Sequence, residues 1–157
     1  MQTDRPAPLI LVDADACPVK DEVYRVAERY GVAVTIVANS FIRIPDDPLI
    51  DRVIVSDGFD AADDWIAERA GDHVLVITAD ILLAERCLAA GAAVLGPKGV
   101  PFTTASIGNA VATRAIMADL RAGGEQIGGP APFTRADRSR FLQAMDAAVR
   151  RLNKPRE

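Results

Sequence analysis

The chain has little cysteine and histidine, and this limits the chemistry that it can perform. It contains two cysteines and one histidine in 157 residues. Cys17 and Cys87 show neither the spacing of a metal site nor that of a disulfide framework, so a reducing, cytoplasmic setting is the expected one. His73 falls in a predicted turn, and without a second histidine a Ser-His-Asp triad or a histidine-based metal site has little support.

Long apolar runs and an excess of positive charge are absent as well. No run approaches the roughly 20 apolar residues of a membrane-spanning helix, and the opening residues MQTDRPAP lack the basic start and apolar core of a signal peptide. The formal net charge is −4 and the pI is about 5.0. This balance argues against nucleic-acid binding over the whole surface, although it leaves room for a local basic face. We therefore expect a protein without a membrane partner.

Apolar strands alternate with amphipathic helices along most of the chain. Half of the residues are hydrophobic and a quarter are charged, as in a globular protein, and the length suits one domain, residues 1–157. Alternation with short connections predicts a mainly parallel, five-stranded sheet. The expected strands are Leu9–Val12, Val32–Ala38, Arg52–Val55, Val74–Ile77 and Ala92–Leu95. The expected helices cover 18–30, about 60–70, 81–90, about 104–121 and about 134–152.

Acidic side chains follow three of these strands at the point where each strand ends. Asp13 and Asp15 follow the first strand, Asp63 and Asp64 lie in the helix after the third, and Asp80 follows the fourth. Because the carboxyl ends of parallel strands share one edge of the sheet, we expect these carboxylates to converge. Carboxylates so placed repel one another unless a cation or protons relieve them. Mg²⁺ and Mn²⁺ prefer such oxygen ligands and can promote phosphodiester hydrolysis.

Helix capping is the competing explanation for several of these acids. Asp60 is a natural N-cap, Asp63 at its N3 position would favour the helix dipole, and Asp80 could cap the next helix. For each residue alone, capping and metal binding remain open. Capping does not explain why Asp13 stands beside Asp15, so we predict that the set is functional.

Four polar residues after strands of the same edge are candidates for binding a phosphate group. Arginine and lysine supply charge-assisted hydrogen bonds, and asparagine and serine supply neutral ones. An ordinary role in loops is equally open for each of them. The candidates for substrate binding are Asn39, Ser40, Arg43 and Lys98.

Five stretches of the chain resemble the YaiI/YqxD family of uncharacterised bacterial proteins. They are VDADACPVKDEVYRVAERYG, VANSFIRIP, VSDGFDAADDWIAERA, TADILLAERCL and PFTRADRSRFLQAMDAAVRR, which together extend over nearly the whole chain. That family is similar in turn to PIN-like nucleases. This second resemblance implies a three-layer α/β/α sandwich whose acidic edge binds Mg²⁺ or Mn²⁺ and cleaves RNA. The YaiI/YqxD family itself implies no established activity.

The match to the nuclease pattern assigns roles to individual acids. It places the acid of the first strand on Asp13, the helix acids on Asp63 and Asp64, and the later acid on Asp80, whereas Asp15 corresponds less closely. The favoured hypothesis is therefore a divalent-metal-dependent ribonuclease. Its main ligands would be Asp13, Asp64 and Asp80, with Asp15 and Asp63 in support.

Two other functions compete with this hypothesis. Asp13-Ala14-Asp15 resembles the first motif of haloacid-dehalogenase-like phosphatases, with Asp13 as nucleophile, and Thr78 and Lys98 could imitate the second and third motifs. Those enzymes need an acidic pair after the lysine, but here the next acid is Asp119, late in an expected helix. The other competitor is a non-catalytic module that uses the same edge to hold a metal or RNA.

Overall fold

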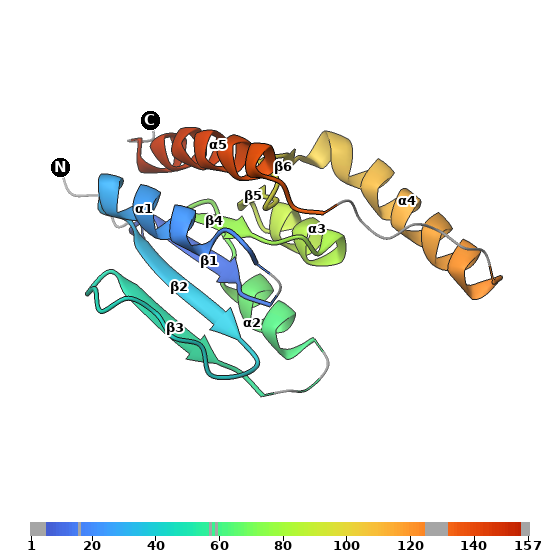
Figure 1. The fold of residues 1–157 in the computed structure, drawn as a ribbon, viewed down its shortest axis with the longest axis horizontal. Helices are drawn as coiled ribbons and strands as arrows, with labels where there is room; N and C mark the ends of the chain where they lie inside the picture. The colour runs from blue at the N-terminus through green and yellow to red at the C-terminus, as the bar shows by residue number, and fades with distance from the viewer. Residues whose placement is uncertain (1–5, 16, 57, 59, 125–131, 155–157) are drawn as a thin grey trace.

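A computed structural model describes residues 6–15, 17–56, 58, 60–124 and 132–154 of the chain. These residues build one six-stranded sheet in the order β3-β2-β1-β4-β5-β6 (Figure 1). The first five strands are mutually parallel, and β6 runs antiparallel to β5. The strands are β1 Leu9–Asp13, β2 Ala33–Ala38, β3 Ile50–Ile54, β4 Val74–Ile77, β5 Ala93–Leu95 and β6 Pro101–Phe102.

The sheet confirms the predicted α/β class and adds a sixth strand. A tight reversal at residues 96–100 returns the chain against β5, with the Gly96 amide donating to the Val100 carbonyl oxygen over 3.0 Å. The strand that follows is only Pro101–Phe102. A strand of two residues leaves no alternating pattern in the sequence, and proline is tolerated there because β6 is an edge strand.

Helices cover both faces of the sheet, which completes the expected three-layer sandwich. They are α1 Lys20–Tyr30, α2 Ala61–Arg69, α3 Ile81–Ala89, α4 Thr104–Ala122 and α5 Arg135–Asn153. One core packs α1 and α5 against side chains such as Ile10, Val12 and Ile36. The other packs α2 and α3 against Leu11 and Val37. Alternate residues of the central strands thus enter opposite cores, as strand geometry requires.

The strand order fixes where a ligand can bind. From β1 the chain adds β2 and β3 on one side, then crosses back to place β4 and β5 on the other side. In open α/β sheets, ligands bind outside the carboxyl ends of the strands at this point of reversal. Asp13 is the last residue of β1, and Thr78 comes directly after β4. The two residues therefore flank the expected binding position.

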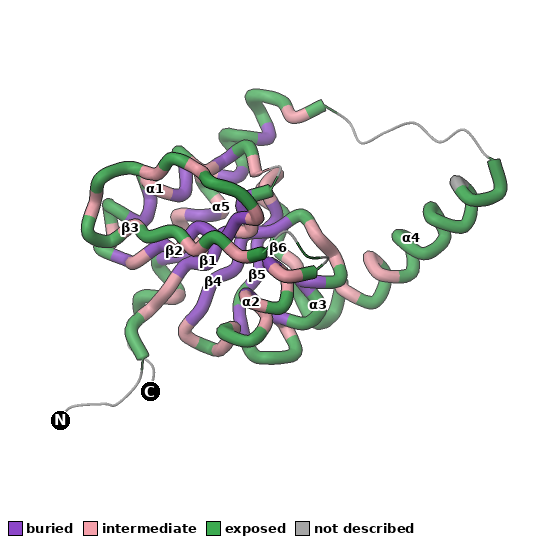
Figure 2. Tube along the Cα trace, turned by 90° about the horizontal axis from the view of Figure 1, so that it is seen from below, coloured by how far each residue is buried: buried purple, intermediate pink, exposed green. Residues whose placement is uncertain are grey.

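The last two helices relate differently to the sandwich. In α5 the stripe of Phe141, Met145 and Val149 is fully buried. Its start is closed by a capping box between Thr134 and Asp137. Helix α4 instead leaves the sandwich and is largely exposed (Figure 2). None of the helices in the described residues is long and apolar enough to cross a membrane.

Candidate functional site

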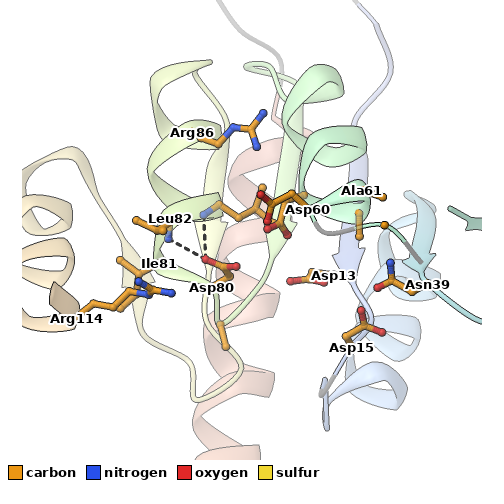
Figure 3. Close-up of a pocket in the computed structure, with 15 residues that line it drawn as sticks. Asp13, Asp15, Asn39, Asp60, Ala61, Asp80, Ile81, Leu82, Arg86 and Arg114 are labelled. Atoms are coloured by element: carbon orange, nitrogen blue, oxygen red, sulfur yellow. Dashed lines mark hydrogen bonds between the residues drawn. The ribbon is translucent and has the colours of Figure 1, made fainter. Parts of the chain in front are cut away.

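A pocket of about 960 Å³ lies at the carboxyl edge of the central strands (Figure 3). Its carboxylates come from four places in the sequence: the end of β1, the loop after it, the start of α2 and the start of α3. They belong to Asp13, Asp15, Asp60, Asp63 and Asp80. The convergence predicted from parallel strands is therefore present for Asp13, Asp15, Asp63 and Asp80, and Asp60 joins them.

Asp13 is the most enclosed part of this acidic group. Burial raises the pKa of its carboxyl group, the hydrogen bond from Thr78 lowers it, and the charges of Asp15 and Asp80 raise it further. The Thr78 hydroxyl donates to Asp13 Oδ2 over 2.8 Å and accepts from the Asp80 amide over 3.0 Å. Thr78 is itself only 2% exposed. One buried hydroxyl thus connects the end of β1 to the start of α3.

Asp80 combines a structural contact with a place in the pocket. Its Oδ1 accepts hydrogen bonds from the amides of Leu82 at 2.9 Å and Leu83 at 3.2 Å, so it caps α3 as predicted (Figure 3). The cap uses Oδ1 alone. The carboxylate therefore serves the start of the helix and lines the pocket at the same time.

Asp60 does not play the capping role that its position predicts. It precedes α2 in the left-handed region, with φ of 65°, and its side chain makes no capping hydrogen bond. An aspartate adopts this backbone more readily than most residues because its short side chain is tolerated there. The carboxylate lines the pocket instead. The sequence-based assignment of Asp60 to capping was wrong in this respect.

Asp63 has the most perturbed carboxyl group of the pocket. Its pKa is raised to about 6, first by burial and then by the charges of Asp80, Asp13 and Asp60, with a hydrogen bond to Asp80 adding to the effect. Such a shift means that the surrounding carboxylates oppose its ionisation. The pocket therefore concentrates negative charge that a proton or a cation would relieve.

Asp64, which the sequence singled out as a main ligand, is not among the residues that line the pocket. Its Oδ1 accepts a hydrogen bond from Arg86 Nη1 over 2.8 Å, with both side chains about half exposed. Adjacent residues of an α-helix point about 100° apart, because there are 3.6 residues per turn. Of the neighbours Asp63 and Asp64, only one can therefore face the pocket, and in the structure it is Asp63.

The pocket also contains two arginines that the sequence patterns do not single out. Arg86 of α3 and Arg114 of α4 both line it (Figure 3). Nothing local in the sequence distinguishes Arg86 from other arginines on helix surfaces. Arg114 reaches the site only because α4 leaves the sandwich beside α3, a path that helical periodicity does not specify. Their charges suit a phosphate group.

Of the four predicted phosphate ligands, Asn39 alone lines the pocket. Its Nδ2 donates to the Ser56 carbonyl oxygen over 3.0 Å, which joins the end of β2 to the end of β3. Ser40 and Arg43 continue into the exposed loop after it. Lys98 does not line the pocket; on the α5 side of the molecule, hydrogen bonds from Thr134 lower the pKa of Asp137, and the charge of Lys98 adds a smaller contribution.

The donor chemistry of the pocket fits a hard divalent cation. In the part of the chain that the structure describes, no three His, Cys, Asp or Glu side chains are arranged to hold a metal ion as they stand. Mg²⁺ does not require such a cage, since it commonly keeps several waters and binds through one or two carboxylates together with substrate phosphates. Asp13 and Asp80 can supply carboxylates of this kind.

Comparisons with known proteins agree on one family. The model of DUF188, described as an uncharacterised YaiI/YqxD family, matches residues 11–151. A UPF0178 protein of Sphingopyxis alaskensis is 69% identical over 94% of this chain and 97% of its own length. Another from Nitrobacter winogradskyi is 61% identical over 92% of each chain. No solved structure matches the chain.

Proposed function

The chain belongs to the YaiI/YqxD family of uncharacterised proteins, and since that family name assigns no activity, we propose a function from the pocket itself. The proposed function is a PIN-like, divalent-metal-dependent ribonuclease that hydrolyses RNA phosphodiester bonds with Mg²⁺ or Mn²⁺. The observation that carries it is that Asp13, Asp80 and other carboxylates line one pocket, at the point where the strand order of the sheet reverses. Two arginines beside these acids supply the positive charge that a phosphate needs.

Each group in the pocket has a defined task under this proposal. Asp13 and Asp80 are the principal cation ligands, with Asp15 and Asp63 in support. The bound cation supplies Lewis acidity and lowers the pKa of a coordinated water. Thr78 orients Asp13 through its hydroxyl, which donates over 2.8 Å. Arg86 and Arg114, both lining the pocket, attract and orient the phosphate.

Arg86 is held in place by Asp64, which gives that acid a positioning role. The guanidinium is fixed by the 2.8 Å contact with Asp64 Oδ1, and this contact raises the pKa of Arg86. Asp64 thereby fixes the side of α3 on which the guanidinium of Arg86 lies. This role replaces the direct metal ligation that we expected from the sequence.

A phosphatase of the haloacid-dehalogenase type receives less support. It would need Lys98 near the proposed nucleophile Asp13, but Lys98 is not among the residues lining the pocket. A non-catalytic module that binds metal or RNA uses the same pocket and differs only in turnover. We therefore keep the binding module as the second candidate.

We propose a cytoplasmic location for this activity. Cys17 and Cys87 are both unpaired, as is usual in a reducing compartment. Burial raises the pKa of both thiols, that of Cys87 to about 11. Both are therefore poor nucleophiles at neutral pH, and neither is assigned a catalytic role.

Cleavage of labelled RNA tests the proposed function. Asp13→Asn and Asp80→Asn should each abolish Mn²⁺-dependent cleavage, while asparagine preserves the size of the side chain and its ability to cap α3. Asp119→Asn, on the exposed surface of α4, is the matched control and should cleave like the wild type. Equal cleavage by all four proteins would refute the ribonuclease. Binding of metal without turnover on any RNA would favour the binding module.

A further inference from the structure

The loop between β2 and β3 carries a conspicuous aromatic side chain. Phe41 is 72% exposed, more than any other large hydrophobic residue in the described chain. Exposed phenylalanine forgoes the favourable free energy of burying an apolar ring. The chain has only eight aromatic residues, five Phe, two Tyr and one Trp. A ring left in solvent at this position therefore calls for a functional explanation.

Local geometry holds this ring outward. From Phe41 to Ile44 exposed and half-buried residues alternate, and the two isoleucines pack against the core beneath α1 and α5. Phe41 and Arg43 accordingly share the outer side of an extended segment. The segment returns past β3 (Figure 1), as it must to start a parallel strand.

Arg52 of β3 completes a flat surface with Phe41. Its guanidinium carbon lies 4.6 Å from the centroid of the Phe41 ring. Its Nη1 also donates to the Ile42 carbonyl oxygen at 3.4 Å, which holds the guanidinium over the loop. A cation–π contact this exposed contributes only about 0.5–1 kcal/mol to stability. The pair leaves most of the ring open to another planar group.

The surface lies next to the acidic pocket. Asn39 lines the pocket and precedes Phe41 by two residues, which places their Cα atoms within about 7 Å of each other. The acids of the loop, Asp46 and Asp47, lie just before β3 begins. Since β3 is parallel to its neighbour, they belong to the opposite edge of the sheet. Phe41, close to the pocket, and these two acids thus stand at opposite ends of the loop.

We propose that Phe41 and Arg52 form a stacking platform for an unpaired base of a single-stranded nucleic acid. The inference rests on the proposed nuclease function and specifies its substrate as single-stranded. A base of a duplex is stacked between its neighbours, whereas an unpaired base can turn out onto an aromatic ring or a guanidinium. The adjoining phosphate then continues toward Asn39 and the pocket, and Arg43 neutralises the backbone outside.

Binding in EDTA tests this platform separately from catalysis. Fluorescence anisotropy with labelled single-stranded RNA, single-stranded DNA and duplex RNA would be measured for the wild type, Phe41→Ala, Phe41→Trp and Arg52→Ala. We expect Phe41→Ala to weaken single-strand binding about tenfold or more, Arg52→Ala to weaken it as well, and Phe41→Trp to preserve it. Ile116→Ala, a 58% exposed apolar residue of α4, is the control and should bind like the wild type.

A fluorescence signal reports the stacking itself. In Phe41→Trp combined with Trp65→Phe, the only tryptophan is the one on the platform, and a stacked base should quench it. Wild-type affinity in Phe41→Ala, no quenching, equal affinity for duplex, or no single-strand binding by the wild type would each overturn the inference. These binding results do not decide whether the protein cleaves RNA. Loss of cleavage in Asp13→Asn would therefore still support the nuclease even if the stacking platform failed its own test.

Discussion

Asp63 in the first turn of α2 and Asp80 at the N-cap of α3 bring two carboxyl groups into one pocket from helices that are separate in sequence. Burial raises the pKa of Asp63 to about 6, and the negative charges of Asp80, Asp13 and Asp60 add to the shift. Asp80 stays fixed because its Oδ1 caps α3 at 2.9 Å from the Leu82 amide. The start of α2 and the start of α3 are therefore held together best when one negative charge is removed.

This relationship predicts that stability depends on pH through Asp63. Its pKa is 3.8 in the unfolded chain and about 6 in the folded one, so the folded protein binds the proton more tightly. The resulting stabilisation is complete below about pH 4 and is lost as the pH rises through about 6. Asp63→Asn should therefore melt at a higher temperature than the wild type at pH 7.

Thermal unfolding at a series of pH values checks this prediction. The difference in Tm between Asp63→Asn and the wild type should grow from pH 4 to pH 7. Asp51→Asn, at an exposed position of β3 far along the sheet, serves as the control and should give a constant difference. If the difference in Tm for Asp63→Asn were also constant with pH, the neighbouring carboxylates would not oppose the ionisation of Asp63, and the prediction would be wrong.

The acidic edge shows how far the sequence could predict the site. Strand and helix patterns were sufficient to bring Asp13, Asp15 and Asp80 to one place, because parallel strands end at one edge. They were not sufficient to choose between Asp63 and Asp64. That choice depends on the rotation of α2 about its own axis, which the packing of Ala62 and Ile66 into the core decides.

Thr78 supplies a second prediction, on the connection between β1 and β4. Thr78→Val removes the hydroxyl that donates to Asp13 and accepts from the Asp80 amide. Leaving buried polar groups without partners costs about 1 to 3 kcal/mol, so the free energy of unfolding should fall by that amount. Thr78→Ser keeps the hydroxyl and should lose less. Urea denaturation of both variants measures this, and a larger loss for serine than for valine would contradict it.

Gly99 supplies a third prediction, on the reversal between β5 and β6. Its φ is +85°, and an added Cβ would stand 2.7 Å from the carbonyl carbon of Arg140 in α5. Gly99→Ala should therefore destabilise the protein by more than about 2 kcal/mol, since the left-handed backbone alone costs an alanine about 1–2 kcal/mol. Gly108→Ala is the matched control.

Gly108 lies inside α4, and a Cβ there would meet nothing within 4 Å. Alanine is about 1 kcal/mol more favourable than glycine in a helix interior, so this variant should be neutral or more stable. Chemical denaturation of the two variants provides the comparison. Equal effects would show that α5 does not pack against the reversal as described.

The parts that sequence reasoning missed depend on long-range packing. Arg114 reaches the pocket through the direction in which α4 departs, and Arg52 meets Phe41 through the pairing of β2 with β3. Neither arrangement has a local pattern. The capping box of Thr134 and Asp137, by contrast, is decided within four residues and needs no long-range packing.

The most direct test of the central claim is the position of Mn²⁺ in the protein itself. Crystals of the wild type and of Asp13→Asn, soaked in MnCl₂, would be compared by anomalous difference maps at the manganese edge. The account predicts a peak in the wild-type pocket between Asp13 and Asp80 that disappears in Asp13→Asn. A wild-type pocket without a peak, or an unchanged peak in the variant, would contradict it.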